Sequence, residues 1–128
     1  MSELLITFAK IFGMKKIYHL SSCSTCVRII KELKPDSKVI LQDIKTECIT
    51  EKQLDDMKYL AGSYEALFSK RAMKYKALGL KEKSLTEADF KTYILSEYTF
   101  LKRPVIMVNE EIFIGNSKST IEKAKIHF

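Results

Sequence analysis

The stretch KKIYHLSSCSTC, residues 15–26, decides how the rest of the chain is interpreted. Its start is short and carries β-branched and aromatic side chains, so Lys15–Leu20 is predicted to be a strand. A polar run follows, and from Ser24 onward apolar side chains recur at helical spacing until Pro35 stops the helix. The two cysteines at the end of the quoted stretch therefore fall where a strand passes into a helix.

The elements that follow predict an α/β fold. Val39–Ile44 reads as a second strand, and a helix between two strands normally joins them in parallel. The middle of the chain is helical, with capping signals at Thr50 and Thr86 and stop signals at Gly62 and Gly79. The expected helices cover residues 50–61, 63–68, 71–78 and 86–101.

The chain returns to strands after Arg103-Pro104. Val105–Val108 and Ile112–Ile114 are predicted strands, and Ser117–Ile126 is a predicted final helix. The whole order is therefore β-α-β, then helices, then β-β-α. We find no repeat, low-complexity tract or interdomain linker.

Length and composition restrict the function classes. A chain of 128 residues has room for one core, and 46% apolar with 30% charged residues is typical of a folded soluble domain. No apolar run reaches the roughly 18 residues of a membrane helix, so no membrane partner is expected. The net charge of +6 favours anionic partners without choosing among oxyanions, nucleic acid and acidic protein surfaces.

Residues 1–13 are interpreted as an N-terminal extension of a single domain that spans residues 14–128. Their apolar stretch is interrupted by Lys10 and lacks both a basic start and a cleavage motif, unlike a signal peptide. The extension is expected to contribute little beyond one short amphipathic helix. Three cysteines are also too few and odd in number for a secreted disulfide scaffold, so we predict a cytoplasmic protein.

The Cys23-Ser24-Thr25-Cys26 motif is the predicted chemical centre. At the first turn of a helix, unsatisfied N–H groups and the helix dipole stabilise negative charge, so a thiol there ionises more readily. The second cysteine follows after about one helical turn, where it can resolve an adduct formed by the first as a disulfide. Ser24 and Thr25 add hydroxyl donors beside the sulfur. Arg28 is close in sequence but rotated away on the helix, which leaves its contribution to an anion site open.

The cysteine pair has two other interpretations. A zinc site needs two more ligands, and Cys48, His19 and His127 stand at no recognisable spacing, so no metal is predicted. An inert buried pair is the second alternative, because cysteine is a common packing residue. Cys48 has no partner at motif spacing and is interpreted as structural. The position between strand and helix favours redox or oxyanion chemistry.

The Arg103-Pro104 pair is the second candidate. A proline before a strand is either a cis residue in a tight turn or an ordinary trans residue, and the sequence leaves both open. In the cis case, Arg103 would be directed toward Cys23 as a forked, permanently charged donor for an oxyanion. The alternative is a solvated surface arginine. The lysines around Arg71, at positions 70, 74, 76, 81 and 83, are interpreted as a solvated basic face.

Three blocks in order resemble the arsenate-reductase and Spx branch of the thioredoxin superfamily. They are IYHLSSCSTC at residues 17–26, SKRAMKYKALGL at 69–80, and LKRPVIMV at 101–108 with IFIG at 112–115. The resemblance covers about residues 14–127. It implies a thioredoxin-like mixed sheet with a helical insertion, about residues 50–101, between the second and third strands.

The same resemblance implies roles for individual residues. The family nucleophile falls on Cys23, the C-x-x-C version adds Cys26, and the arginine before the cis-proline falls on Arg103. Arg71 matches the arginine of the middle block, and with Ser24, Thr25 and Pro104 it is a predicted substrate-binding residue. Relatives often carry a basic residue where this chain has Val27, and arsenate-reducing members carry an arginine where it has Asn116.

Three functions follow from this resemblance. The preferred one is a thiol oxidoreductase similar to arsenate reductase, in which Cys26, or external glutathione and glutaredoxin, resolves the Cys23 adduct. No cofactor would be bound. The alternative is a redox-sensing regulator similar to Spx that binds RNA polymerase through a Cys23–Cys26 switch, without direct nucleic-acid contact. A general glutathione-dependent thiol reductase is the third, and the sequence does not separate it from the first.

Overall fold

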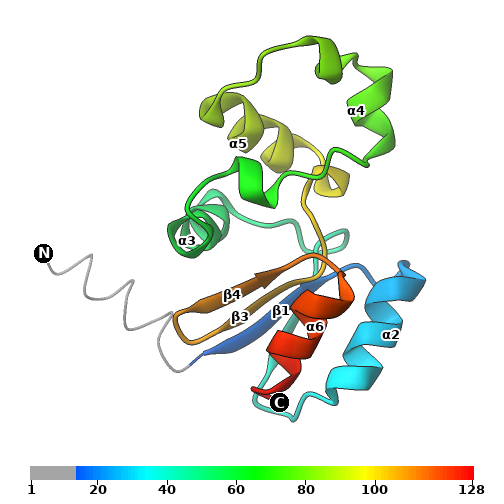
Figure 1. The fold of residues 1–128 in the computed structure, drawn as a ribbon, viewed down its shortest axis with the longest axis vertical. Coiled ribbons are helices and arrows are strands. Elements are labelled where there is room, and N and C mark those ends of the chain that lie inside the picture. Colours follow the sequence, from blue (N-terminus) through cyan, green and yellow to red (C-terminus); the bar gives the residue numbers. More distant parts are fainter. Residues whose placement is uncertain (1–13) are drawn as a thin grey trace, which may run out of the picture. The chain divides into compact units, whose positions relative to one another are not determined.

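The structure, a computed structural model, describes residues 14–128 and forms two compact units (Figure 1). One unit combines the described residues up to Glu47 with Arg103–Phe128, and the other is Cys48–Lys102. The predictions for residues 1–13 lie outside the described part of the chain. That residues 14–128 act as one domain stays a prediction.

The first unit contains a four-stranded mixed sheet. Its strands are β1 (Lys15–His19), β2 (Ile40–Asp43), β3 (Val105–Val108) and β4 (Glu111–Ile114), in the order β2-β1-β3-β4. β1 pairs with β2 in parallel, whereas the β1–β3 and β3–β4 pairs are antiparallel. The predicted α/β class, with parallel strands joined by a helix and a mixed sheet, is confirmed.

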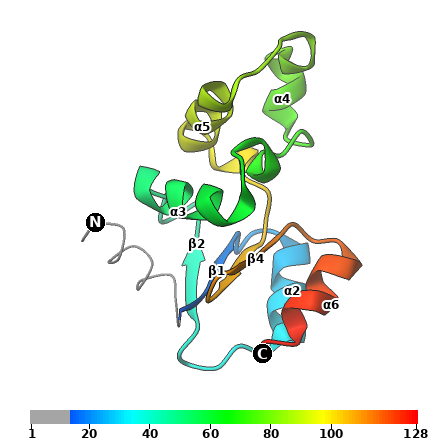
Figure 2. The same cartoon turned by 60° about the vertical axis from the view of Figure 1, so that its left-hand side comes forward.

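Two helices cover one face of this sheet, α2 (Ser24–Leu33) and α6 (Lys118–Lys125), and they lie side by side (Figures 1 and 2). Both pack through buried side chains onto β1 and β3, forming a core of Ile17, Ile29, Leu33, Val39, Ile106, Val108, Ile121 and Ala124. Because β4 is antiparallel to β3, and β3 to β1, β1 and β4 run the same way. The helices that follow these two strands therefore begin at the same edge of the sheet.

The second unit is helical, as predicted. It comprises α3 (Glu51–Ala61), α4 (Met73–Ala77) and α5 (Glu87–Ser96), with 3₁₀ turns at Glu65–Leu67, Leu80–Glu82 and Tyr98–Phe100. The capping boxes at the starts of α3 and α5 are present, because Thr50 pairs with Gln53 and Thr86 with Asp89 in both directions. These short-range signals place the helix starts where the sequence predicts them.

The prediction of one helix from Thr86 to about Leu101 is wrong at its C-terminal end. α5 stops at Ser96, because Glu97 adopts an extended backbone (φ −150°, ψ 115°). On a continuous helix at 100° per residue, Phe100 would stand about 80° away from Phe90. The break allows Phe100 to stack on Phe68, with ring centroids 5.1 Å apart, while Phe90 contacts the same ring at 4.9 Å. The end of the helix at Ser96 therefore accompanies the packing of Phe90 and Phe100 on the ring of Phe68.

The helices are short. The longest within residues 14–128, α3, has 11 residues. A membrane crossing requires roughly 20 predominantly apolar residues in a helix. None of the helices in this part of the chain has both the length and the apolar character needed to cross a membrane.

Candidate active site

Cys23 stands at the junction that the sequence predicts, between β1 and α2. It is the residue immediately before the helix and has an extended backbone (φ −95°, ψ 113°). Its N–H donates to the Leu20 carbonyl at 3.0 Å, and its own carbonyl accepts from the Val27 N–H at 3.1 Å. These two hydrogen bonds hold Cys23, which is half-exposed, at the N-terminus of α2, beside the unpaired N–H groups of the first turn.

The environment of Cys23 favours its thiolate. Partial burial acts to raise the pKa of the thiol, but it is outweighed by the Cys26 N–H, the Cys26 thiol and the Thr25 N–H, which stabilise charge on the sulfur. The positive charge of Arg103 acts in the same direction. The net result is a pKa below the ordinary value of 9.0. The sulfur is therefore more often ionised near neutral pH than a free thiol is.

Cys26 has the opposite character. Burial, which leaves the residue 1% exposed, is the largest cause that raises its pKa to about 11. The Leu20 N–H and the Arg103 charge act to lower the pKa, while the charge on Cys23 and the hydrogen bond to it act to raise it. Cys26 therefore carries a proton when Cys23 does not, and the proton lies between the two sulfurs. The pair combines an ionised, accessible thiol with a protonated, buried one.

The charge of Arg103 lowers the pKa of both thiols, which indicates that this side chain lies near the two sulfurs. It directly precedes β3, and β3 pairs with β1 so that Val105 stands opposite Tyr18, close to the end of β1 that leads to Cys23. The Arg103–Pro104 peptide bond is cis, which is one of the two forms that the sequence leaves open. This pairing brings the arginine to the cysteine loop from a distant part of the chain.

The predicted substrate-binding residues fall in both units. Ser24 is exposed and Thr25 is half-buried in the first turn of α2, while Pro104 is buried beside Arg103. Arg71 lies in an exposed turn of the second unit, just before α4. Their roles in binding a substrate stay predictions.

The cysteine loop has one further supporting contact, which was not predicted from the sequence. The Ser21 hydroxyl donates to the carboxylate of Asp43, the last residue of β2, and this bond is the largest cause that lowers the pKa of Asp43. The Ile44 N–H also donates to the His19 carbonyl at 2.9 Å. The parallel register, which places His19 opposite Asp43, is the signal that could have revealed the pair. The loop is therefore anchored to the neighbouring strand.

The remaining candidate ligands do not gather around the pair. All three cysteines are free thiols, and Cys48 is an exposed residue of the second unit. Within residues 14–128 there is no group of three or more His, Cys, Asp and Glu side chains arranged to hold a metal ion. The chemistry of the described site therefore rests on Cys23, Cys26 and Arg103.

A mixed β2-β1-β3-β4 sheet with a C-x-x-C pair before its first helix and a cis-proline before β3 defines a thioredoxin-like protein. A family model agrees with this class and narrows it. The model of the ArsC family matches residues 18–124, which is most of the chain. The chain belongs to the ArsC family, so the predicted branch of the superfamily is confirmed. No curated protein matches the chain.

Solved structures share this fold. The chain is similar to an arsenate reductase from Vibrio cholerae at 16% identity, with 88% of this chain and 98% of that one covered and a TM-score of 0.73. A protein from Bacteroides fragilis, described as related to the ArsC family, has 22% identity over 86% and 97% of the chains, with a TM-score of 0.72. An arsenate reductase related protein from Brucella melitensis has 19% identity over 86% and 92%, with a TM-score of 0.65. At these identities the likeness establishes the fold.

Proposed function

We propose that the protein is a thiol-dependent oxidoreductase that reduces a small oxyanion, with Cys23 as nucleophile. The observation that carries this proposal is the opposite behaviour of the two thiols. The pKa of Cys23 is below its ordinary value, whereas that of Cys26 is raised to about 11. A nucleophile must be ionised and accessible, and a resolving thiol must stay protonated until it is needed. The pair meets both requirements.

Bond formation at Cys23 prepares Cys26 for the second step. Two of the causes that raise the pKa of Cys26 are the negative charge on Cys23 and the hydrogen bond between the two side chains. Both disappear once the Cys23 sulfur is covalently bonded, because that sulfur then carries no negative charge. The Arg103 charge and the Leu20 N–H, which act in the other direction, remain. Cys26 therefore ionises more readily in the adduct than in the resting protein.

Arsenate is the substrate that the proposal names. The thiolate of Cys23 attacks arsenic(V), and an arsenate oxygen leaves as water after taking up protons. The thiolate of Cys26, or of glutathione, then attacks the Cys23 sulfur, and the sulfur–arsenic bond breaks with its electron pair left on arsenic. Arsenite is released and a disulfide remains, which glutathione and glutaredoxin reduce. The solved relatives named as arsenate reductases support this choice.

We assign binding of the oxyanion substrate to Arg103 and to the start of α2. The guanidinium carries a permanent charge beside the reactive sulfur, and its fork suits a tetrahedral oxyanion. The first-turn N–H groups of α2, with the hydroxyls of Ser24 and Thr25, supply further donors. Arg71 is proposed as an additional cation for the substrate on the strength of its match to the family block.

Steady-state turnover with arsenate, glutathione and glutaredoxin tests the proposal, with NADPH oxidation by glutathione reductase as the readout. Cys23→Ser should abolish turnover, whereas Cys48→Ser, a matched change at an exposed thiol, should leave it unchanged. Cys26→Ser separates internal from external resolution, because activity survives only if glutathione attacks the adduct directly. Absence of arsenate turnover in the unmodified protein would refute the substrate assignment.

The Spx-like regulator uses the same two thiols in another way. A disulfide between Cys23 and Cys26 would change the surface that a partner contacts, and their hydrogen bond is compatible with that switch. A pull-down with RNA polymerase separates the two proposals. Binding that differs between the reduced and oxidised forms, together with absent arsenate turnover, would favour the regulator. Equal binding in both forms, or none, would remove it.

A further inference from the structure

The Cys23 sulfur lies between two pieces of backbone that must keep their relative placement. On one side, the N–H groups of Thr25 and Cys26 in the first turn of α2 stabilise its negative charge. On the other side, the turn of residues 20–23 brings the chain from β1 to the sulfur. The thiolate benefits from the two N–H groups only while both pieces are held in place.

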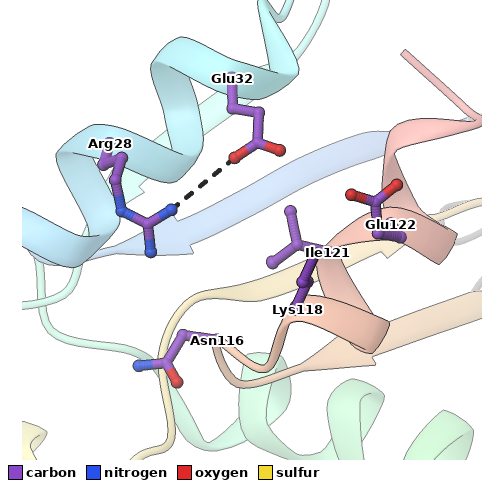
Figure 3. Close-up of a pocket in the computed structure, with 6 residues that line it drawn as sticks. All are labelled: Arg28, Glu32, Asn116, Lys118, Ile121 and Glu122. Carbon is purple, nitrogen blue, oxygen red and sulfur yellow. Dashed lines mark ion pairs between the residues drawn. The ribbon is translucent and has the colours of Figure 1, made fainter.

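α2 is held by its neighbours in the first unit. Ile29 and Leu33 are buried in the core, and the polar side of the helix faces α6. The Glu32 carboxylate pairs with Arg28 at 3.8 Å and with Lys125 of α6 at 3.7 Å, so its charge is balanced within the protein. Figure 3 shows the first of these pairs beside a pocket of about 230 Å³ between the two helices, which is lined by Arg28, Glu32, Asn116, Lys118, Ile121 and Glu122. The helix therefore stays in place independently of the turn before Cys23.

The turn before Cys23 is held by fewer contacts. Leu20 is 6% exposed, but Ser21 and Ser22 are exposed, so their side chains fix nothing by burial. The hydrogen bond from the Cys23 N–H to the Leu20 carbonyl, at 3.0 Å, closes the turn. The Ser21 hydroxyl ties the turn to the sheet, because it donates to the carboxylate of Asp43 at the end of β2.

Asp43 is an acceptor that is already fixed. Its Oδ1 accepts from the Lys45 N–H at 3.1 Å, and its backbone carbonyl accepts from the Glu47 N–H at 2.8 Å. The hydrogen bond from Ser21 is the largest cause that lowers the pKa of its carboxyl group, and the charge of His19, which stands opposite in the parallel register, acts in the same direction. The acceptor is therefore ionised at neutral pH and loses little freedom when it binds the hydroxyl group.

We propose that Asp43 is a positioning residue for the nucleophile. Through Ser21 it holds the turn of residues 20–23 in the conformation that keeps the Cys23 sulfur against the first-turn N–H groups of α2. Loss of the Ser21–Asp43 hydrogen bond would free the turn, so the sulfur would spend less time beside these groups and its pKa would rise. This inference rests on the role of Cys23 in the proposed function, and it adds a residue that acts on the thiol from a neighbouring strand.

The pH profile of Cys23 alkylation by iodoacetamide tests the proposal, in a Cys48→Ser background that removes the exposed thiol. Ser21→Ala and Asp43→Ala should each move the profile to higher pH. At pH 7 alkylation should slow between about twofold and tenfold, which corresponds to a rise of up to about one unit in the pKa of Cys23.

Asp36→Ala is the matched control. Asp36 is also an exposed aspartate whose Oδ1 accepts from a backbone N–H two residues later, that of Lys38 at 2.8 Å. It precedes β2, whereas Asp43 is the last residue of that strand. The change therefore removes a similar turn contact at the other end of the strand, and the Cys23 profile should stay where it is.

Asp43→Asn separates positioning from a direct effect of the charge. The Asn amide keeps a partner for Ser21, because a hydroxyl group can accept as well as donate. Positioning therefore predicts an Asp43→Asn profile close to that of the unmodified protein. A direct effect on the sulfur predicts the opposite sign, because removal of a negative charge would lower the pKa of Cys23 in both Asp43→Asn and Asp43→Ala.

A double variant tests whether the two residues act together. Ser21→Ala combined with Asp43→Ala should move the profile no further than either change alone, because both remove the same hydrogen bond. Ser21→Ala changes an exposed residue, so it tests the proposal even if Asp43→Ala lowers stability. Additive shifts, an unmoved Ser21→Ala profile, movement to lower pH, or an equal shift in Asp36→Ala would each overturn the positioning role.

Alkylation requires no arsenate, so this proposal and the proposed function can fail separately. Shifted profiles in a protein without arsenate turnover would refute the substrate assignment and leave Asp43 as a determinant of thiol reactivity. Turnover with profiles that do not move in Ser21→Ala and Asp43→Ala would refute the positioning role and leave the oxidoreductase.

Discussion

Removal of the Cys23 side chain should lower the pKa of Cys26. The pKa of about 11 for Cys26, against an ordinary 9.0, means that at pH 7 its thiolate fraction is about one hundredth of that of an ordinary thiol. Burial is the largest cause, and the Cys23 charge and hydrogen bond contribute the rest of the increase. Cys23→Ala removes the last two and leaves the burial. The thiolate fraction at pH 7 should therefore rise, by less than about a hundredfold.

The sign of the pH dependence follows from the same causes. In the unmodified protein, Cys26 gains its charge only as the pH approaches about 11. In Cys23→Ala the gain should begin at lower pH, because no neighbouring thiolate opposes it. Cys26→Ala should act in reverse on Cys23, raising the pKa of that thiol by removal of a hydrogen-bond donor. Cys26→Ser retains a donor and should have the smaller effect.

A ¹³C NMR titration of the cysteine Cβ signals measures both groups directly, in a Cys48→Ser background that removes the exposed thiol. The Cys26 titration should move to lower pH in Cys23→Ala. An unchanged or higher pKa would show that burial alone sets the value. The argument that adduct formation at Cys23 releases Cys26 for the second step would then be refuted.

Three further predictions concern the arginine, a cap and the core. Arg103→Ala should move the pH profile of Cys23 alkylation by iodoacetamide to higher pH, because a stabilising charge is lost, whereas Arg103→Lys should restore most of the profile. Thr50→Ala should lower the free energy of unfolding, measured in urea, by about 1 kcal/mol through loss of the capping box, whereas Ser84→Ala, at an exposed site outside any helix, should change it little. Ile106→Ala should cost roughly 2–5 kcal/mol in the same assay, because this fully buried β3 side chain leaves a cavity in the core. An Arg103→Ala profile that coincides with the unmodified one, equal costs for Thr50→Ala and Ser84→Ala, or a cost below 1 kcal/mol for Ile106→Ala would contradict the respective prediction.

Local signals predicted most of the secondary structure. Thr50 and Thr86 act on N–H groups three residues away, so a sequence window of four residues contains the whole interaction. The same holds for Cys23, whose place before α2 depends on the adjoining strand and helix. The helix end at Ser96 was not predictable in this way, because the contact that accompanies it joins Phe100 to Phe68, a residue far away in the sequence.

The candidate site was predicted in part. Cys23 and Cys26 are three residues apart, and one helical turn brings their side chains together. Ser21 and Asp43 are joined only through the register of two strands, and no short motif indicates that register. Arg28 illustrates the same difficulty, since its rotation away from the cysteine loop directs it to a pocket whose other side is α6.

The sequence by itself determined the order of strands and helices, the presence of a thiol pair at a helix start and the family to which the chain belongs. These depend on interactions within a few residues and on motifs that can be compared directly. Only the tertiary structure decided that the Arg103 charge acts on both sulfurs, and that Arg28 and Lys118 line one pocket. The physical reason is that Cys23 and Arg103 stand eighty residues apart and meet only because β3 pairs with β1.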